Sequence, residues 1–186
     1  NPNNGTLSLN PDGSFTYVHD GSENHSDSFT YTLNDTGCDS NIATVSFAIT
    51  PVNDCPVAVG NTYQVMEGFT LSPSSADGVY KFDFDVDIPA NSFSSTHKSL
   101  PSHGVLSCTD PSDPRNGQTN VICENGSFSY AHDGTNTKSD SFEYKISDGT
   151  CDSNDALILI TIIDVNDCPT AVGETYTIQR NSTLSI

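Results

Sequence analysis

The stretch at residues 14–21, SFTYVHDG, returns at residues 127–134 as SFSYAHDG, and this pair decides the fold. The offset between the two copies is 113 residues, and it holds without a gap through three further matches. These matches pair residues 26–31 with 139–144, 38–41 with 151–154, and 52–56 with 165–169. Self-similarity at a fixed offset is the sequence signature of tandem structural repeats.

Apolar and polar residues alternate within each copy. Residues 29–33 (FTYTL) and 45–49 (VSFAI) place a large apolar side chain at every second position, which is the period of a half-buried strand. Short runs of this kind are separated by Asp-Gly, Asn-Gly and proline turn signals, and no stretch of ten or more residues has a helical period. The predicted fold class is therefore all-β, with tandem β-sandwiches and Greek-key connections.

The second copy contains an insert that the first copy lacks. Residues 4–8 match residues 103–107 at an offset of 99 instead of 113, so 14 extra residues follow this match. The insert contains residues 110–117 (DPSDPRNG), which are rich in turn formers. We predict a lengthened hairpin at residues 108–123, closed by a disulfide between Cys108 and Cys123.

Acidic side chains dominate the charge of the chain. The sequence has 24 Asp and Glu against 6 Lys and Arg, a formal net charge of −18. Nucleic acid and anionic membrane surfaces are unlikely partners for such a chain, because both attract basic residues. The 7 Tyr and 9 Phe argue for a folded chain rather than a disordered one. No apolar run is long enough to span a membrane, and the charge is expected to attract a cation.

Cysteines and glycosylation sequons indicate an extracellular or cell-surface location. Six cysteines favour an oxidising compartment, where disulfides persist. Sequons of the form Asn-x-Ser/Thr have meaning only in a secretory route. Candidate glycosylation sites lie at Asn4, Asn24, Asn34, Asn125 and Asn181.

The ordered set of motifs resembles a known family of repeats. Residues 5–17 (GTLSLNPDGSFTY), 27–31 (DSFTY) and 51–54 (PVND) resemble the tandem cadherin-like repeats of large surface proteins and bacterial adhesins. Residues 19–23 (HDGSE) are similar to chondroitin-sulphate-proteoglycan repeats. The resemblance implies an immunoglobulin-like or cadherin-like sandwich in an extracellular stalk or adhesive module, often with calcium at the joints. It implies no catalysis.

The frame of that family predicts one complete repeat and two complementary partial ones. Residues 54–166 make the complete repeat, residues 1–53 the C-terminal part of another, and residues 167–186 the first strands of a third. About 50 residues of incomplete sheet bury too little apolar surface to be stable alone and expose open edges. We expect residues 167–186 to complete a sandwich begun by residues 1–53, either by covalent continuation of a longer array or by strand donation to a neighbouring copy.

The repeated cysteines predict two more disulfides. Cys38 and Cys55 bracket one strand, as do Cys151 and Cys168, and a strand of about 10 residues spans roughly 33 Å, too far for a bond within either pair. In a sandwich of this type, the turn before the last strand lies at the same end as the entry to the first strand. We therefore predict Cys55–Cys151 within the chain and Cys168–Cys38 between copies, with free or differently paired thiols as the alternative.

Oxygen-bearing side chains near the linker form a candidate calcium site. Calcium prefers six to eight oxygen ligands, and residues 82–87 (FDFDVD) supply alternating carboxylates near the entry to the complete repeat. A solvated acidic rim or a set of turn caps is the alternative interpretation. Residues 179–181 (QRN), which replace Glu67 and its neighbours in the third repeat, weaken any equivalent site there. The candidate ligands are Asn53, Asp54, Glu67, Asp85, Asp87 and Asp148.

These observations favour a structural protein over an enzyme. The sequence contains no G-x-S-x-G, H-E-x-x-H or C-x-x-C motif, and the repetition of His19-Asp20 at His132-Asp133 indicates turn chemistry. The predicted function is a subunit of an extracellular fibre or stalk, whose partners are other copies of itself. The alternatives are an adhesin or glycan-binding module that uses the 108–123 hairpin, and a glycan carrier.

Overall fold

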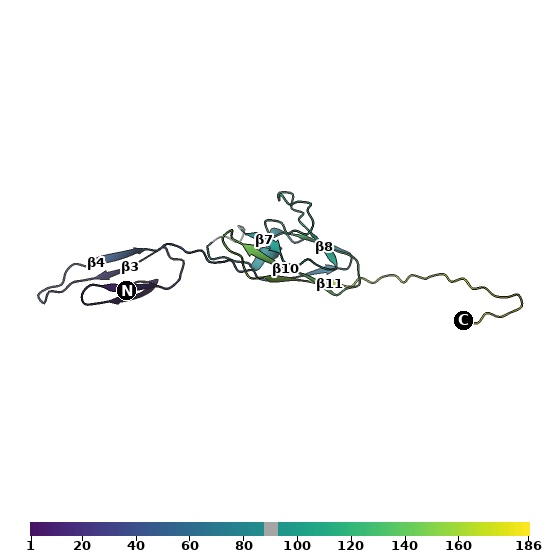
Figure 1. Cartoon of the computed structure of the whole chain (residues 1–186), viewed down its shortest axis with the longest axis horizontal. Helices are drawn as coiled ribbons and strands as arrows, with labels where there is room; N and C mark the ends of the chain where they lie inside the picture. The colour runs from purple at the N-terminus through teal and green to yellow at the C-terminus, as the bar shows by residue number, and fades with distance from the viewer. Residues whose placement is uncertain (88–92) are drawn as a thin grey trace.

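The computed structural model describes residues 1–87 and 93–186. Figure 1 shows an N-terminal β unit, a second and larger β unit, and a C-terminal segment that runs away from both. Among the described residues, no helix has the length and apolarity needed to cross a membrane.

Two facing sheets form the larger unit. One sheet has the strand order β5-β11-β10-β7, and the other has the order β6-β9-β8. The first strand, β5, runs parallel to the last strand, β11, whereas the other pairs are antiparallel. The strands are β5 (Asn61–Met66), β6 (Thr70–Leu71), β7 (Ser94–His97), β8 (Gly104–Ser107), β9 (Ser129–His132), β10 (Ser139–Ser147) and β11 (Ala156–Ile163).

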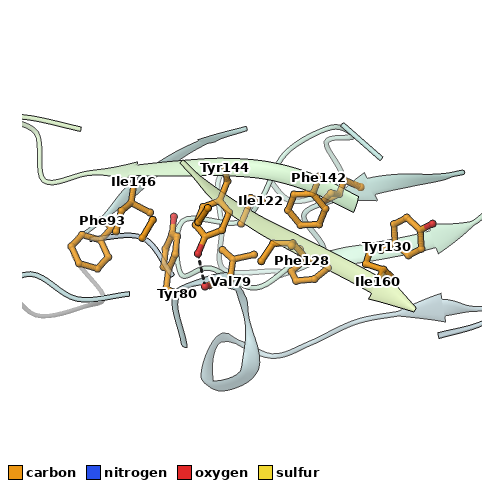
Figure 2. Close-up of a cluster of buried hydrophobic side chains, with 14 of the residues drawn as sticks. Val79, Tyr80, Phe93, Ile122, Phe128, Tyr130, Phe142, Tyr144, Ile146 and Ile160 are labelled. Atoms are coloured by element: carbon orange, nitrogen blue, oxygen red, sulfur yellow. Dashed lines mark hydrogen bonds between the residues drawn. The ribbon is translucent and has the colours of Figure 1, made fainter. Parts of the chain in front are cut away.

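The core of this unit comes from strands that alternate between buried and exposed residues. In β11 every second residue from Ala156 onward is buried, and Ile158 and Ile160 are fully enclosed. In β10 the alternation buries Phe142, Tyr144 and Ile146 on the same side. Figure 2 shows these side chains packed against others from the facing sheet. A two-layer sandwich follows from this pattern, as the sequence predicts.

The structure contains two short 3₁₀ helices that the strand pattern did not predict, and the second of them contributes buried side chains to the core. They are η1 (Ser75–Asp77) and η2 (Val79–Phe82). η2 buries Val79 completely, and the Tyr144 hydroxyl donates to the Val79 carbonyl at 2.9 Å (Figure 2). Gly78 precedes η2 because a Cβ at this position would lie 2.2 Å from the carbonyl oxygen of Gly126.

The N-terminal unit contains two hairpins, which correspond to strands β8–β11 of the larger unit. β1 pairs only with β2 and β3 only with β4 among the described residues. Its inward face is open, because Phe15 is 43% exposed where its counterpart Phe128 is 1% exposed. The strands are β1 (Gly5–Leu9), β2 (Phe15–His19), β3 (Ser26–Tyr31) and β4 (Ala43–Ala48).

The insert at residues 108–123 extends the hairpin, as the sequence predicted, by only a short paired stretch and is otherwise a loop of turns. A disulfide joins Cys108 to Cys123, with 4.9 Å between the Cα atoms. The paired stretch consists of a bridge between Ser107 and Thr119, and the Gly117 amide donates to the Cys108 carbonyl at 2.8 Å beside it. Two prolines, Pro111 and Pro114, explain why this stretch is short, since proline cannot donate to a strand ladder.

The C-terminal segment, residues 167–186, is exposed and carries no strand in the single chain. It does contain one ordered turn, in which the Ser182 amide donates to the Gln179 carbonyl at 3.2 Å. Among residues 1–87 and 93–186, the predicted opening strands of a third repeat therefore have no pairing partner in their own chain.

Candidate functional site

The linker enters the larger unit through a cluster of oxygen-bearing side chains. The Asn53 side-chain amide donates to Oδ2 of Asp148 at 2.8 Å. The backbone amide of Asp54 donates to Oδ2 of Asp87 at 2.7 Å. These bonds bring together residues that lie up to 95 positions apart in the sequence. We call Asn53, Asp54, Asp85, Asp87 and Asp148 the entry cluster.

Asp85 and Asp148 contribute carboxylates of different character to the entry cluster. Oδ1 of Asp85 accepts the Asp87 amide at 2.8 Å, but its Oδ2 is shielded from solvent and has no hydrogen-bond donor among the described residues. Asp148 accepts the amides of Cys151 and Thr150 and the Asn53 side chain, and these donors lower its pKa. Carboxylate and amide oxygens are ligands that a hard cation such as calcium takes, so the entry cluster offers oxygen ligands of the right chemical kind.

Glu67 does not belong to this cluster, which corrects one of the six expected ligands. β5 carries the chain from the entry end to the opposite end of β11, and the Glu67 amide donates to the Ile163 carbonyl at 2.9 Å. A strand of eight residues spans about 26 Å, so Glu67 lies far from Asp54. Oε2 of Glu67 accepts the Val165 amide at 3.3 Å, and its buried Oε1 has no partner among the described residues.

Asp83 is a buried carboxyl whose separate role the sequence did not reveal. It is 5% exposed and faces the core, whereas Asp87 accepts the linker amide of Asp54 and Asp85 accepts the Asp87 amide. Burial raises the pKa of Asp83 to about 6, although the Val59 amide and the Tyr144 hydroxyl donate to it and oppose that shift. The three aspartates of residues 82–87 therefore do not share one face, because this segment is not a regular strand.

A hydrogen bond from a tyrosine hydroxyl to an aspartate carboxylate recurs in both copies, and it was not predicted from the sequence. The Tyr130 hydroxyl donates to Asp140 at 2.8 Å, and the Tyr17 hydroxyl donates to Asp27 at 2.9 Å. Burial opposes ionisation of Asp27, but the amides of Asn3, Asn4 and Ser28 together with Tyr17 hold its pKa at about 2. The signal was available in the sequence, since both pairs are repeated at the 113-residue offset.

The cysteines divide into two bonded pairs and two free thiols. Cys55 and Cys151 form a disulfide at the entry end, with 5.5 Å between the Cα atoms. This pairing and Cys108–Cys123 are the two that the sequence predicts within one chain. Cys38 and Cys168 are exposed and free in the single chain. Their predicted bond joins two copies and therefore stays a prediction.

The five sequons lie in different environments. Asn24, Asn34 and Asn181 are exposed, and Asn4 is half-buried. Asn125 is also half-buried, and its side-chain amide nitrogen donates to Oδ2 of Asp110 at 2.5 Å. Because a glycan attaches to the side-chain nitrogen, attachment at Asn125 would disturb this bond, as attachment at Asn34 would disturb its 2.6 Å bond to Asp39.

A shallow pocket of about 320 Å³ lies between the insert and the edge strand β7. Arg115 enters it from the insert, and its Nε donates to Asp113 at 3.3 Å. The Nη2 atom of Arg115 is shielded from solvent and has no acceptor among the described residues. The other lining residues are Ser95, Thr96, His97, Val121 and Ile122.

Comparison with known families assigns most of the chain. Residues 53–164 match the family described as bacterial cadherin-like domain. Residues 1–48 match the family described as bacterial Ig domain. The boundary between the two matches falls in the linker that precedes Asp54.

The relatives are longer proteins. The human extracellular matrix organizing protein FRAS1 is 33% identical over 146 residues, which is 72% of this chain and 3% of FRAS1. Human protocadherin-24 EC1-2 superposes with a TM-score of 0.48 at 15% identity, covering 85% of this chain and 77% of that one. Human desmocollin-1 superposes with a TM-score of 0.43 at 12% identity, covering 96% of this chain and 34% of that one.

Proposed function

Because the chain belongs to the bacterial cadherin-like domain family, we propose that it is a structural subunit of an extracellular fibre or stalk. The family is typically non-enzymatic, and the family together with the FRAS1 relative indicates an extracellular location. Copies join head to tail in this proposal. The incomplete unit at residues 1–53 of one copy receives residues 167–186 of another.

The open inner face of the N-terminal unit is the observation that supports this assembly most. A groove of about 620 Å³ runs along this face, lined by Leu9, Phe15, Phe29, Tyr31 and Val45 among others. Tyr31 is 38% exposed on this face, whereas its counterpart in the larger unit, Tyr144, is fully buried. An apolar face of this kind next to unpaired strand edges recruits further strands.

A disulfide between copies would lock the joint. Cys55 lies 113 residues before Cys168, and Cys38 lies 113 residues before Cys151. The bonded pair Cys55–Cys151 therefore has an equivalent in Cys168 of one copy and Cys38 of the next. Both thiols are exposed and available for that bond.

Calcium would stiffen the joints. Cadherin-like domains generally bind calcium, and the entry cluster offers several carboxylates beside the linker. Asp85 offers an Oδ2 with no hydrogen-bond donor among the described residues, and Asp148 offers a carboxyl whose pKa is lowered by its donors. The side chains of the cluster would have to move closer together to hold one ion, because no three of its carboxylates lie within 4.8 Å of one another in the described part of the chain. A bound ion would neutralise these like charges and hold the linker at one angle to the unit that follows it.

Sedimentation velocity and negative-stain electron microscopy of the full chain test this function. We expect non-reduced protein to form linear assemblies whose length increases with concentration. The Cys38→Ser/Cys168→Ser variant should form shorter assemblies that dissociate on dilution, and Cys108→Ser/Cys123→Ser should assemble as the unaltered chain does. A chain that stays monomeric at every concentration, with free Cys38 and Cys168, would contradict the proposal.

The insert pocket supports a second candidate function, a glycan-binding or adhesin module. The shielded Nη2 of Arg115 fits an acidic sugar, because guanidinium groups bind carboxylate and sulfate well. Binding of acidic oligosaccharides by the Cys38→Ser/Cys168→Ser variant tests this candidate. Loss of binding in Arg115→Gln, with Arg180→Gln unchanged, would favour the glycan-binding function.

A further inference from the structure

We propose that residues 174–184 of one copy add two strands to a second copy, in the register that β5 and β6 take on β11 and β9. This inference rests on the head-to-tail function proposed above and specifies its geometry. The segment after Gly173 lies parallel to β4 of the second copy, turns at Asn181, and pairs antiparallel with β2.

Each receiving strand lacks one neighbour that its counterpart has. In the larger unit β11 lies between β5 and β10, and β9 lies between β6 and β8. Within the residues that the structure describes, β4 is paired only with β3, and β2 only with β1. The missing neighbours are thus the equivalents of β5 and β6, which map by the 113-residue offset onto residues 174–179 and 183–184.

The turn between the two donated strands is already formed in the free segment. Gly68 has φ of 72° between β5 and β6, and Asn181 at the equivalent position has φ of 62°. The Phe69 amide donates to the Met66 carbonyl at 3.0 Å, and the Ser182 amide donates to the Gln179 carbonyl at 3.2 Å in the same way. Asparagine adopts this left-handed conformation more readily than most residues. A preformed turn lowers the entropy cost of docking.

The larger unit also supplies the register. β11 pairs Leu159 with Thr62 and Thr161 with Gln64, which predicts pairs of Ser46 with Thr175 and Ala48 with Thr177. β9 pairs with β6 in an antiparallel register that matches Thr70 with Ala131 and Leu71 with Tyr130. The equivalent pairs across the two copies are Val18 with Thr183 and Tyr17 with Leu184.

In this register the apolar side chains of the donated strands face the open groove. Tyr63 meets Phe128 edge-on with 5.2 Å between the ring centroids, so its equivalent Tyr176 should meet Phe15. Val65 is 6% exposed in the larger unit, whereas its equivalent Ile178 is 49% exposed in the free segment. Tyr176 is likewise 45% exposed in the single chain. A shift by one residue would turn these side chains to solvent, which makes the register specific.

A histidine acceptor fixes the turn in the larger unit, and its counterpart is ready to do the same. Nδ1 of His132 accepts the amides of Gly68 at 3.0 Å and Gly134 at 3.2 Å. In the described part of the chain, Nδ1 of His19 accepts only the equivalent of the second donor, the Gly21 amide, at 3.3 Å. The amide of Asn181, equivalent to that of Gly68, supplies the missing donor when the turn docks.

Charge at the donated turn supports the same pairing. Residues 1–53 carry six Asp and Glu and no Lys or Arg, whereas residues 174–184 carry Glu174 and Arg180 and have no net charge, with Arg180 in the turn. A single basic side chain next to an acidic surface is attracted to it most strongly at low ionic strength. Arg180→Glu should therefore weaken assembly, and added salt should reduce the difference between this variant and the unaltered chain.

Cross-linking of full chains at single engineered cysteines tests the register. The background is Cys38→Ser/Cys168→Ser, which removes the native free thiols. A Val18→Cys copy mixed with a Thr183→Cys copy should form a disulfide-linked dimer on air oxidation. The bond should form at least about tenfold faster than with Ser182→Cys, whose side chain points to the other face. Non-reducing gel electrophoresis measures both rates.

The position 181 supplies a second test that needs no cross-link. Asn181→Gly keeps the left-handed turn and should assemble at least as tightly as the unaltered chain. Asn181→Ala should assemble about fivefold more weakly, because alanine resists that conformation. Assembly in which both cysteine pairs cross-link equally fast and both position-181 variants behave alike would overturn the register and leave the head-to-tail function standing. Absence of any assembly in the unaltered chain would overturn the function itself.

Discussion

The surroundings of two aspartates in this protein shift the pKa values of their carboxyl groups in opposite directions. Asp27 is held ionised by the backbone amides of Asn3, Asn4 and Ser28 and the Tyr17 hydroxyl, with its pKa at about 2. Asp83, enclosed beneath β10, has a pKa raised by burial to about 6. The sequence revealed neither difference, because a run such as residues 82–87 states which residues are acidic but not which of them the fold encloses.

The raised pKa of Asp83 predicts a pH-dependent contribution to stability. Between the unfolded pKa of about 3.9 and the folded pKa of about 6, the folded state holds a proton that the unfolded state releases. The contribution of Asp83 to stability is therefore greatest below pH 4 and falls as the pH rises to 6. Asp83→Asn should remove this slope. The melting temperature of the variant minus that of the unaltered chain should therefore increase from pH 4 to 7.

The control for this measurement is Asp77→Asn. Asp77 lies on η1 and makes an exposed ion pair with Lys81, so its replacement should shift the melting temperature little at any pH. A difference for Asp83→Asn that is constant from pH 4 to 7 would contradict the assignment of a raised pKa.

At the scale of strands, the repeat and the alternation of apolar residues predicted most elements. β2 and β3 fall on the quoted repeats, and β9 and β10 fall on their second copies, because a buried face forces a period of two. η2 was not predicted, because its burial depends on the cavity between the two sheets rather than on a local pattern. Glu67 was assigned to the wrong end because sequence proximity to the linker does not show that β5 crosses the whole sandwich.

The separation of Glu67 from the entry cluster predicts different effects on calcium binding. Asp85→Asn and Asp87→Asn should each weaken binding at the entry end by roughly tenfold, since each removes a charged ligand. Glu67→Gln should leave that affinity unchanged. Isothermal titration calorimetry of the Cys38→Ser/Cys168→Ser protein, stripped of metal beforehand, measures all three. Equal weakening by Glu67→Gln and Asp85→Asn would contradict the separation.

The two intrachain disulfides should differ in their effect on stability. Cys55 and Cys151 are separated by 96 positions and Cys108 and Cys123 by 15. Constraining the longer loop removes more entropy from the unfolded chain, about 4.7 kcal/mol against about 3 kcal/mol. Replacing both cysteines of each pair with serine and measuring urea unfolding should show the larger loss for Cys55–Cys151. The reverse order would indicate that native packing of the insert outweighs chain entropy.

At the scale of the whole molecule, the three parts differ in how complete they are. The larger unit has two sheets and an enclosed core, the N-terminal unit has two hairpins with an open face, and the last twenty residues have a single turn. This division was predictable from the repeat offset, because each part matches a different portion of one repeat. Figure 1 shows the parts one after another along the long axis of the molecule.

Hydrogen exchange should therefore show three levels of protection in dilute protein. Amides of β10 and β11 should exchange slowest, since they lie in the enclosed core. Amides of β1–β4 should exchange much faster, and those of residues 167–186 at nearly the unprotected rate. Concentrating the sample should protect β2, β4 and residues 174–184 together. Protection of β1–β4 equal to that of β10 in dilute monomer would show that the N-terminal unit is complete by itself.

The disulfide between Cys55 and Cys151 has a mechanical consequence. It connects the residue at which the chain enters the larger unit to the approach to β11, the strand by which the chain leaves it. A pulling force on the two linkers passes through the sulfur atoms directly into β11, and residues 56–150 remain a closed loop that bears no tension. With the bridge intact, load can extend only the chain from Cys151 to Asp164, to about 45 Å. Without the bridge, load could extend the whole chain from Cys55 to Asp164, to about 380 Å.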